Sequence, residues 1–311
     1  MSGLLVLSFF LACGARPPVS PVLDDAGSTR GDAGTSTEVD AGLERDAGPP
    51  DAGPSDAGSG PSDAGTPRCS VTTDVVRCSV RVTPMVVSGV TREVYWEAPT
   101  TPPPASGYPV VVMYQGSFGS PSLTWTQVAS TTPFGGYQQA RLQALLLERG
   151  FVVVAPVALG GVAWQTNTGL VWSLTNDSAF VTALLDGFSR GDFGPIDTAR
   201  QYATGISSGG YMTSRMAVSY PGEFRALAIA SASYATCAGV VCVVPTLPMN
   251  HPPTLFLHGA LDTTVPEYTA RQYFTALGND GVTTDFVSAP LVGHAWLDVA
   301  PERVTAWFET H

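Results

Sequence analysis

The chain contains no lysine, only four histidines, and no N-terminal apolar run long enough to cross a bilayer. Its 15 basic residues are all Arg and stand against 26 Asp and Glu, which gives a formal net charge of −11. The arginines form no basic patch, so the composition argues against a nucleic-acid partner. The apolar run at residues 4–12 is shorter than a membrane-spanning helix requires.

Cysteine is also scarce, and its spacing argues against a metal site. Of the five cysteines, Cys69 and Cys78 flank a predicted hairpin, and Cys237 and Cys242 close a short loop. Neither pair has C-x-x-C spacing or a nearby pair of histidines, which a zinc site would need. We therefore predict the disulfides Cys69–Cys78 and Cys237–Cys242, which leave Cys13 as the odd residue.

The N-terminus predicts export. Residues 1–13 read as a signal peptide, because the apolar run is short and ends at small residues. The segment LACG at 11–14 resembles a bacterial lipobox, in which the cysteine is lipidated after cleavage. The absence of Lys and Arg and the presence of Phe10 depart from that pattern. The protein is expected to be a cell-surface lipoprotein attached to the membrane through Cys13, or else to be secreted.

Residues 14–67 predict a disordered linker. Asp-Ala-Gly triplets recur there among Pro, Ser and Thr, and no apolar face is available for burial. The triplets are irregularly spaced, which argues against calcium-binding repeats and against a stacked solenoid. Ten acidic residues and three Arg precede Arg68, so the linker is acidic and repels itself.

Residues 68–311 predict one catalytic domain of the α/β class. Short β-rich runs alternate with helical patterns along this stretch, which is typical of a mostly parallel sheet covered by helices on both faces. The predicted strands are 94–96, 110–114, 151–154, 202–204, 226–229, 254–257 and 284–287. The predicted helices are 137–149, 177–190, 211–220, 267–277 and 301–309.

The segment GISSGG at 205–210 lies between a predicted strand and a predicted helix. A serine between glycines at such a turn is how α/β-hydrolases present a nucleophile, so Ser207 is the candidate nucleophile. The chain has 33 Gly, and a G-x-S-x-G match can arise by chance in it. A downstream acid and histidine, in that order, must therefore support the assignment.

His294 and Asp262 supply that support. His294 follows the last predicted strand, where this fold carries its general base. Asp262 follows the strand at 254–257, and Asp285 and Asp298 are its competitors for the role of acid. The order Ser207, Asp262, His294 is the order of the hydrolase fold, which favours Asp262. By contrast, His258 ends a buried strand and reads as structural.

Backbone amides complete the predicted site. In this fold one oxyanion donor is the N–H of the residue after the nucleophile, here Ser208. The second comes from the loop after an early strand, YQGSFG at 114–119, and Ser117 is our choice. Many hydrolases have His-Gly at this point, and Gln115 replaces that histidine.

Several longer motifs carry a family resemblance. GISSGGY at 205–211, TSRMA at 213–217, YP at 220–221 and VVMYQGSF at 111–118 resemble secreted medium-chain-length polyhydroxyalkanoate depolymerases. The resemblance covers most of residues 68–311 and none of the linker. It implies a single α/β-hydrolase domain that cleaves a water-insoluble aliphatic polyester or its oligomers as a monomer, without metal or organic cofactor.

The substrate remains open at this point. Aromatic residues near the predicted mouth are candidate substrate contacts: Phe118, Trp125, Trp164, Trp172 and Trp296. Ordinary core packing is the alternative for each of these side chains. The alternative functions are a carboxylesterase for soluble feruloyl or acetyl esters, a short-chain polyhydroxybutyrate depolymerase, and a non-catalytic hydrolase-fold protein that binds surfaces.

Overall fold

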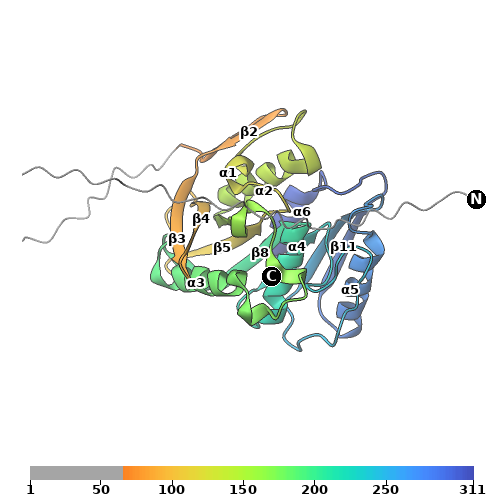
Figure 1. Ribbon diagram of the computed structural model, residues 1–311. Helices are drawn as coiled ribbons and strands as arrows, with labels where there is room; N and C mark the ends of the chain where they lie inside the picture. Colours follow the sequence, from red (N-terminus) through yellow and green to blue (C-terminus); the bar gives the residue numbers. More distant parts are fainter. Residues whose placement is uncertain (1–65) are drawn as a thin grey trace, which may run out of the picture. The chain divides into compact units, whose positions relative to one another are not determined.

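A computed structural model describes residues 66–311, which form an eight-stranded sheet in the order β11-β10-β9-β8-β5-β7-β4-β3 (Figure 1). Strands β5, β7, β8, β9, β10 and β11 are parallel, and the β3–β4 hairpin adds an antiparallel edge. The strands are β3 (Arg81–Val87), β4 (Val90–Glu97), β5 (Tyr108–Tyr114), β7 (Val152–Pro156), β8 (Ile196–Ile206), β9 (Ala226–Ala230), β10 (Thr254–Gly259) and β11 (Thr284–Ala289).

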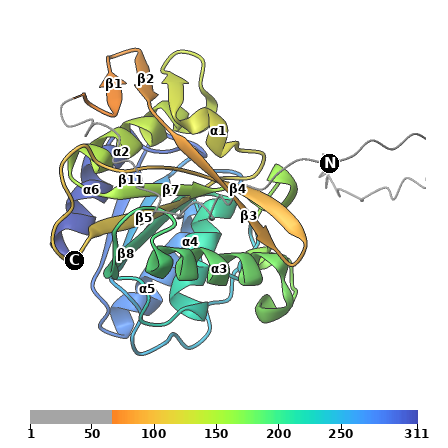
Figure 2. The same ribbon diagram turned by 90° about the vertical axis from the view of Figure 1, so that its left-hand side faces the viewer.

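Helices cover both faces of this sheet (Figure 2). One face packs against α2 and α6, and the other packs against α3, α4 and α5. The helices are α1 (Pro121–Thr124), α2 (Gly136–Glu148), α3 (Asn176–Arg190), α4 (Ser208–Ser219), α5 (Glu267–Asn279) and α6 (Ala300–Thr310). Short 3₁₀ turns are η1 (Pro133–Gly135), η2 (Leu159–Gly161), η3 (Gln165–Asn167) and η4 (Trp172–Leu174). None of the helices between residues 66 and 311 is long and apolar enough to cross a membrane.

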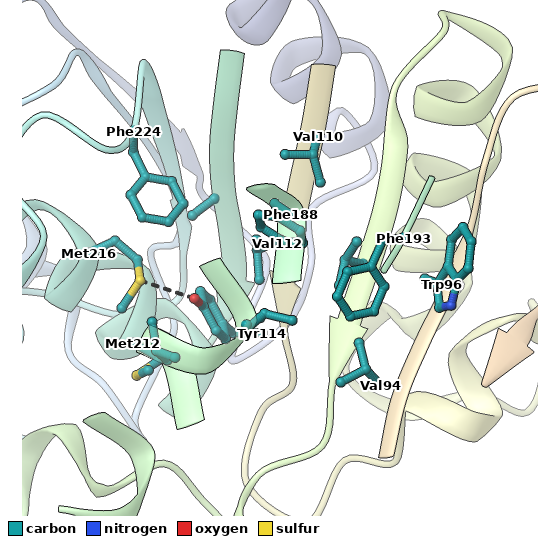
Figure 3. Packing of buried hydrophobic residues seen from close by; sticks show 14 of the residues in the cluster. Val94, Trp96, Val110, Val112, Tyr114, Phe188, Phe193, Met212, Met216 and Phe224 are labelled. Carbon is teal, nitrogen blue, oxygen red and sulfur yellow. Dashed lines mark hydrogen bonds between the residues drawn. The ribbon is translucent and has the colours of Figure 1, made fainter. Parts of the chain in front are cut away.

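The central strands are apolar throughout because both of their faces are covered. All seven residues of β5 are buried. Val112 and Tyr114 pack with α3 and α4 on one face, and Val111 and Met113 pack with α2 on the other. Figure 3 shows the first of these clusters, in which the Tyr114 hydroxyl lies 3.0 Å from Met216 Sδ.

The predicted α/β-hydrolase fold is confirmed, and every predicted strand and helix is present. The helix predicted at 211–220 begins earlier, at Ser208. Strands β1 (Cys69–Val71) and β2 (Val75–Cys78) form the hairpin predicted between Cys69 and Cys78. Strand β3 and strand β6 (Thr126–Val128), which pairs with β2, were not predicted. The signal-peptide, lipidation and linker predictions for residues 1–13 and 14–67 fall outside the described residues, except for the last two positions of the linker.

Both predicted disulfides are present. Cys69 and Cys78 are opposite each other in the antiparallel pair β1–β2, and Cys237 and Cys242 close a loop after β9. Disulfides persist in oxidising compartments, so the folded part of the chain is that of an exported protein.

A buried ion pair ties the sheet to the loop that follows β7. Arg92 Nη1 lies 2.6 Å from Asp177 Oδ1, and both side chains are almost fully buried. The other Asp177 oxygen accepts a hydrogen bond from the Gln165 backbone at 2.6 Å, and Arg92 also donates to the Val157 carbonyl. Burial lowers the pKa of Arg92, and the charge of Asp177 opposes that shift.

We predict that Asp177→Ala lowers the free energy of unfolding by about 3–5 kcal/mol, because it leaves Arg92 buried without its counter-charge. Asp192→Ala breaks an ion pair that is largely solvent-exposed, and should cost less than about 1 kcal/mol. Denaturant unfolding of both variants measures the difference. Equal losses in the two variants would contradict this account of the buried pair.

A second buried polar pair predicts a pH dependence of stability. His251 is buried, with Nε2 2.5 Å from the Tyr273 hydroxyl and Nδ1 2.8 Å from the Pro252 carbonyl oxygen. Burial lowers the pKa of His251 to about 4, against an opposing effect of the Pro252 carbonyl. The unfolded chain therefore binds this proton more readily than the folded chain does between pH 6.5 and about 4.

Consequently, His251 should make the protein less stable as the pH falls from about 6.5 to about 4, by up to tenfold in the folding constant per pH unit. Denaturant unfolding at a series of pH values should show this slope, and His251→Asn should reduce it. If His251→Asn and the parent chain show the same slope of stability against pH over this range, His251 is not the source of that slope.

Candidate active site

Ser207 occupies a strained turn between β8 and α4. Its φ and ψ are 56° and −122°, a region that non-glycine residues rarely adopt. The Ser207 N–H donates to the Ala230 carbonyl of β9 at 3.0 Å, and the Ser207 carbonyl accepts from the Tyr211 N–H of α4 at 3.0 Å. This strand–turn–helix geometry is that of a nucleophile elbow, as the sequence predicted.

The glycines of this turn are required by close backbone packing. A Cβ at Gly209 would overlap the carbonyl oxygen of Tyr114, at the end of β5. A Cβ at Gly205 would lie 2.5 Å from the Gly209 carbonyl oxygen and 2.7 Å from that of Tyr114. Strands β5 and β8 and helix α4 therefore approach so closely that only glycine fits at either position, although glycine weakens a helix.

Asp262 and His294 form the second part of the site. Asp262 Oδ2 lies 2.7 Å from His294 Nδ1, across the loops that follow β10 and β11. The other Asp262 oxygen accepts from the backbone N–H groups of Thr264 and Val265. The competing acids are engaged elsewhere, since Asp285 pairs with Arg303 and Asp298 accepts from Gln138.

The environment of Asp262 keeps its carboxylate charged. Burial by itself would raise the pKa of Asp262, but hydrogen bonds from His258, His294 and the Val265 N–H outweigh burial and lower it well below its usual range. His258 Nε2 lies 3.4 Å from Asp262 Oδ2 and 2.8 Å from the Val265 carbonyl oxygen. His258 therefore helps to hold the loop that carries Asp262, in keeping with the structural role predicted for it.

The end of β9 links the Ser207 turn to the His294 loop. The residue after Ala230 is Ser231, whose hydroxyl donates to the carbonyl oxygen of Ala295 at 3.2 Å. Ser231 has a φ of 46°, and Phe118 and Phe134 also have positive φ. Among residues 66–311, four of the five non-glycine residues with positive φ therefore lie in segments that border Ser207 or His294, as is common at functional sites, and the fifth, Ser88, lies in the β3–β4 turn.

The loop after β5 passes close to Ser207. A Cβ at Gly116 would lie 3.7 Å from the Ser207 Cβ and 3.3 Å from the Ile206 carbonyl oxygen, so glycine permits this approach. Ser117 is exposed in this loop. Ser208 is the first residue of α4, and its N–H has no partner within the helix because the first-turn amides lack a preceding carbonyl. Both proposed oxyanion amides therefore belong to segments that border Ser207.

Gln115 holds the loop after β5 in place, the loop from which the sequence predicts an oxyanion donor. Its Nε2 donates to the carbonyl oxygen of Gly119 at 2.6 Å and to that of Gly161 at 3.3 Å, and its Oε1 accepts from the Ala158 N–H at 3.0 Å. Trp164 adds two bonds, from its Nε1 to the Gln115 carbonyl oxygen at 3.0 Å and from its backbone N–H to Ser208 Oγ at 2.9 Å. Gln115 thus fastens the loop after β5 to the loop after β7, and Trp164 fastens the start of α4 to the same loop.

Three of the predicted substrate contacts belong to the core instead. Trp125, Trp164 and Trp296 are each at most 2% exposed, so their indoles offer no surface to a substrate and the prediction is wrong for them. Trp172 is partly buried and packs edge-on against Tyr220. Phe118, in contrast, is 83% exposed and lies next to Ser117.

Phe134 is a residue that the sequence analysis missed. Its ring contacts the His294 ring edge-on, with 6.2 Å between the ring centres, and its carbonyl oxygen accepts from the Trp296 N–H. The sequence shows only that the run Pro133-Phe134-Gly135-Gly136 forms a sharp turn before the helix that becomes α2. Nothing in that turn indicates contact with a histidine more than a hundred residues later.

Solved structures share this fold. Esterase 2 of Thermogutta terrifontis, phosphonylated by sarin, is 18% identical, with a TM-score of 0.52 over 73% of this chain and 92% of that one. S-formylglutathione hydrolase of Staphylococcus aureus is 13% identical, with a TM-score of 0.54 over 74% of this chain and 98% of that one. At such identities the likeness shows the fold alone, which is that of the α/β-hydrolases.

A relative of known activity gives the family. Poly(3-hydroxyoctanoate) depolymerase of Pseudomonas fluorescens is 47% identical over 251 residues, which cover 79% of this chain and 89% of that protein. The chain therefore belongs to this family of depolymerases, which are ester hydrolases. No family model matched the sequence.

The contacts of Gln115 predict a role in positioning the oxyanion loop. Gln115→Leu removes the side chain's three hydrogen bonds, and we expect kcat on a soluble p-nitrophenyl ester to fall by about 10²-fold, the cost of one oxyanion donor. KM should change little, because the loop acts on the transition state. Gln138→Leu, on the outer side of α2, serves as the control. A rise in KM without loss of kcat would assign Gln115 to substrate binding instead.

Proposed function

We propose that this protein is an exported serine esterase that cleaves ester bonds of an aliphatic polyester, a poly-3-hydroxyalkanoate of medium side-chain length. The observation that carries the proposal is the Asp262–His294 hydrogen bond of 2.7 Å, formed by loops that border the strained turn of Ser207. Membership of the depolymerase family supports the substrate class. We assign residues 68–311 as the catalytic domain, with residues 14–67 as its linker.

The proposed mechanism uses Ser207, His294 and Asp262. His294 Nε2 removes the proton from Ser207 Oγ as that oxygen attacks the ester carbonyl carbon. Asp262, bonded to Nδ1, holds the imidazole in the required tautomer and stabilises the cation that forms. The amides of Ser208 and Ser117 donate to the oxyanion of the tetrahedral intermediate, which collapses when the alcohol end of the polymer leaves with the proton from His294.

Water completes the cycle. His294 removes a proton from a water molecule that attacks the acyl–Ser207 ester, and a second tetrahedral intermediate releases the hydroxyacid end with Ser207 restored. The low pKa of Asp262 supports this scheme, because its carboxylate stays charged whenever the imidazole is protonated. Phe118 is the aromatic residue that we retain as a substrate contact, on the basis of its exposure beside Ser117.

An exported protein can be anchored at the cell surface or released, and we propose that this one is a cell-surface lipoprotein. Lipidation of Cys13 would account for the fifth cysteine, since the other four are paired in disulfides. Residues 14–67 would then hold a monomeric catalytic domain at a distance from the membrane. Release of the natural protein from cells without a bound lipid would favour simple secretion.

We predict that Ser207→Ala abolishes clearing of poly(3-hydroxyoctanoate) films, and that Asp262→Asn lowers turnover by about 10⁴-fold, because the imidazole then takes the wrong tautomer. Asp298→Asn is the matched control, since its carboxylate bonds to Gln138 away from His294. Clearing zones and release of hydroxyacids measure the effect.

Two further substrates test the specificity. Polyhydroxybutyrate and a feruloyl ester should be cleaved much more slowly than poly(3-hydroxyoctanoate). Fast turnover of the feruloyl ester with no clearing of any polyester would make the protein a carboxylesterase for soluble esters. Wild-type activity in Ser207→Ala would refute the assignment of the nucleophile.

A further inference from the structure

The loops at the carboxyl edge of the sheet carry almost no charge. No Asp, Glu or Arg occurs in residues 115–140, 157–176, 231–244 or 286–297, although twelve Arg and sixteen acids lie between Arg68 and His311. These ranges contain the segments that leave the carboxyl ends of β5, β7, β9 and β11. The carboxyl ends of parallel strands meet at one edge, so the uncharged loops surround Ser207.

Hydrogen bonds join these loops into a continuous surface. The Phe118 N–H donates to the Val162 carbonyl oxygen at 2.7 Å, which links the first loop to the second. Asn167 Nδ2 donates to the Cys237 carbonyl oxygen at 3.0 Å, which links the second loop to the disulfide loop. On the other side of the site, the Trp296 N–H donates to the Phe134 carbonyl oxygen, which links the last loop back to the first.

Large apolar side chains project from this uncharged surface. The six most relevant are Phe118, Val171, Leu174, Val240, Val241 and Leu291, each at least 65% exposed. They come from the four loops described above, whereas the helices α2, α3, α4 and α6 expose no large apolar residue of this kind. Elsewhere among residues 66–311 only Val86 of β3 and Met249 before β10 are as exposed, and they stand singly. Exposed apolar side chains gathered in this way mark an interaction surface rather than chance exposure.

We propose that this uncharged apolar face, defined by those six residues and their four loops, is the surface on which the enzyme adsorbs to solid polyester. The inference rests on the proposed function and adds where and how the solid substrate is held. A polyester surface offers alkyl groups and neutral esters, so an uncharged face can bury apolar area against it without desolvating an ion. A phospholipid surface is disfavoured, because the face has no Arg to meet a phosphate group.

The face also explains how a chain end or loop of the polymer reaches Ser207. The nucleophile lies at the same edge of the sheet as the adsorbing side chains, so adsorption presents the ester bond directly to the site. Apart from Phe118, which is also the retained substrate contact, the adsorbing side chains take no part in bond cleavage. Adsorption and cleavage should therefore be separable by substitution of the other five residues.

The test uses two exposed residues that have no part in the catalytic machinery. Leu174→Asp and Val240→Asp are combined in the full chain, each placing a charge on the face. Met249→Asp is the control, because Met249 is fully exposed but precedes β10, at the opposite edge of the sheet. Adsorption isotherms on poly(3-hydroxyoctanoate) particles are measured in a Ser207→Ala background, so that hydrolysis does not consume the surface.

We expect the adsorption constant of the double variant to fall by at least about tenfold, because one or two aliphatic side chains are no longer buried against the polymer. Met249→Asp should adsorb like the parent. With Ser207 intact, turnover of a soluble p-nitrophenyl ester should stay within about twofold of the parent in both variants. Adsorption of the parent should not weaken when salt is raised to about 1 M, because no charge contributes to it.

Unchanged adsorption of the double variant would overturn the proposal, as would stronger binding of the parent to anionic phospholipid vesicles than to polymer. If the aspartates reduce soluble-ester turnover, Leu174→Ser and Val240→Ser carry the same comparison with less disturbance. Failure of the parent to hydrolyse any ester would refute the proposed function instead, and the isotherms would still decide whether this face adsorbs to polyester.

Discussion

The site depends on how closely β5, β8 and α4 approach one another. Gly205 and Gly209 face the Tyr114 carbonyl with no space for a Cβ, and this packing places α4 directly at the end of β8. The chain must then turn within one residue, which puts Ser207 at a positive φ. The strain at Ser207 is maintained by the buried strands on either side, since β5 and the end of β8 expose almost no surface. Close packing of the core therefore sets the position of Ser207, the proposed nucleophile.

The rest of the site is assembled on that frame by loops that are fastened to one another. Gln115 and Trp164 connect the oxyanion segments to the loop after β7, and the Arg92–Asp177 pair fixes that loop to the edge of the sheet. Asp262 and His294, the proposed acid and base, come from the loops after β10 and β11, and Ser231 joins the His294 loop to β9. The parallel strands thus carry the parts of the site on their connecting loops, and buried charged groups together with neutral hydrogen bonds hold these parts together.

Sequence patterns were sufficient for the elements and for the strained turn at Ser207, because continuous apolar strands, helical spacing and a glycine-flanked serine are local signals. They also selected the Asp262–His294 pair, which the structure brings within 2.7 Å. They failed for Trp125, Trp164 and Trp296. Whether an indole in a loop faces solvent depends on which segments fold over it, and these partners are distant in sequence. From the sequence, Gln115 was noted only as a departure from the His-Gly pattern of other hydrolases. Its three hydrogen bonds show that it connects the loop after β5 to the loop after β7. The contact of Phe134 with His294 is equally non-local.

The central claim is that Ser207 is the one serine activated as a nucleophile. A direct measurement is intact-protein and peptide mass spectrometry after treatment with diethyl p-nitrophenyl phosphate, which phosphorylates activated serines irreversibly. The account predicts one diethylphosphoryl group per chain, located on Ser207, with loss of esterase activity in proportion to labelling and a much slower reaction in Asp262→Asn. Labelling of another residue with Ser207 unmodified, or full inactivation without phosphorylation of Ser207, would contradict it.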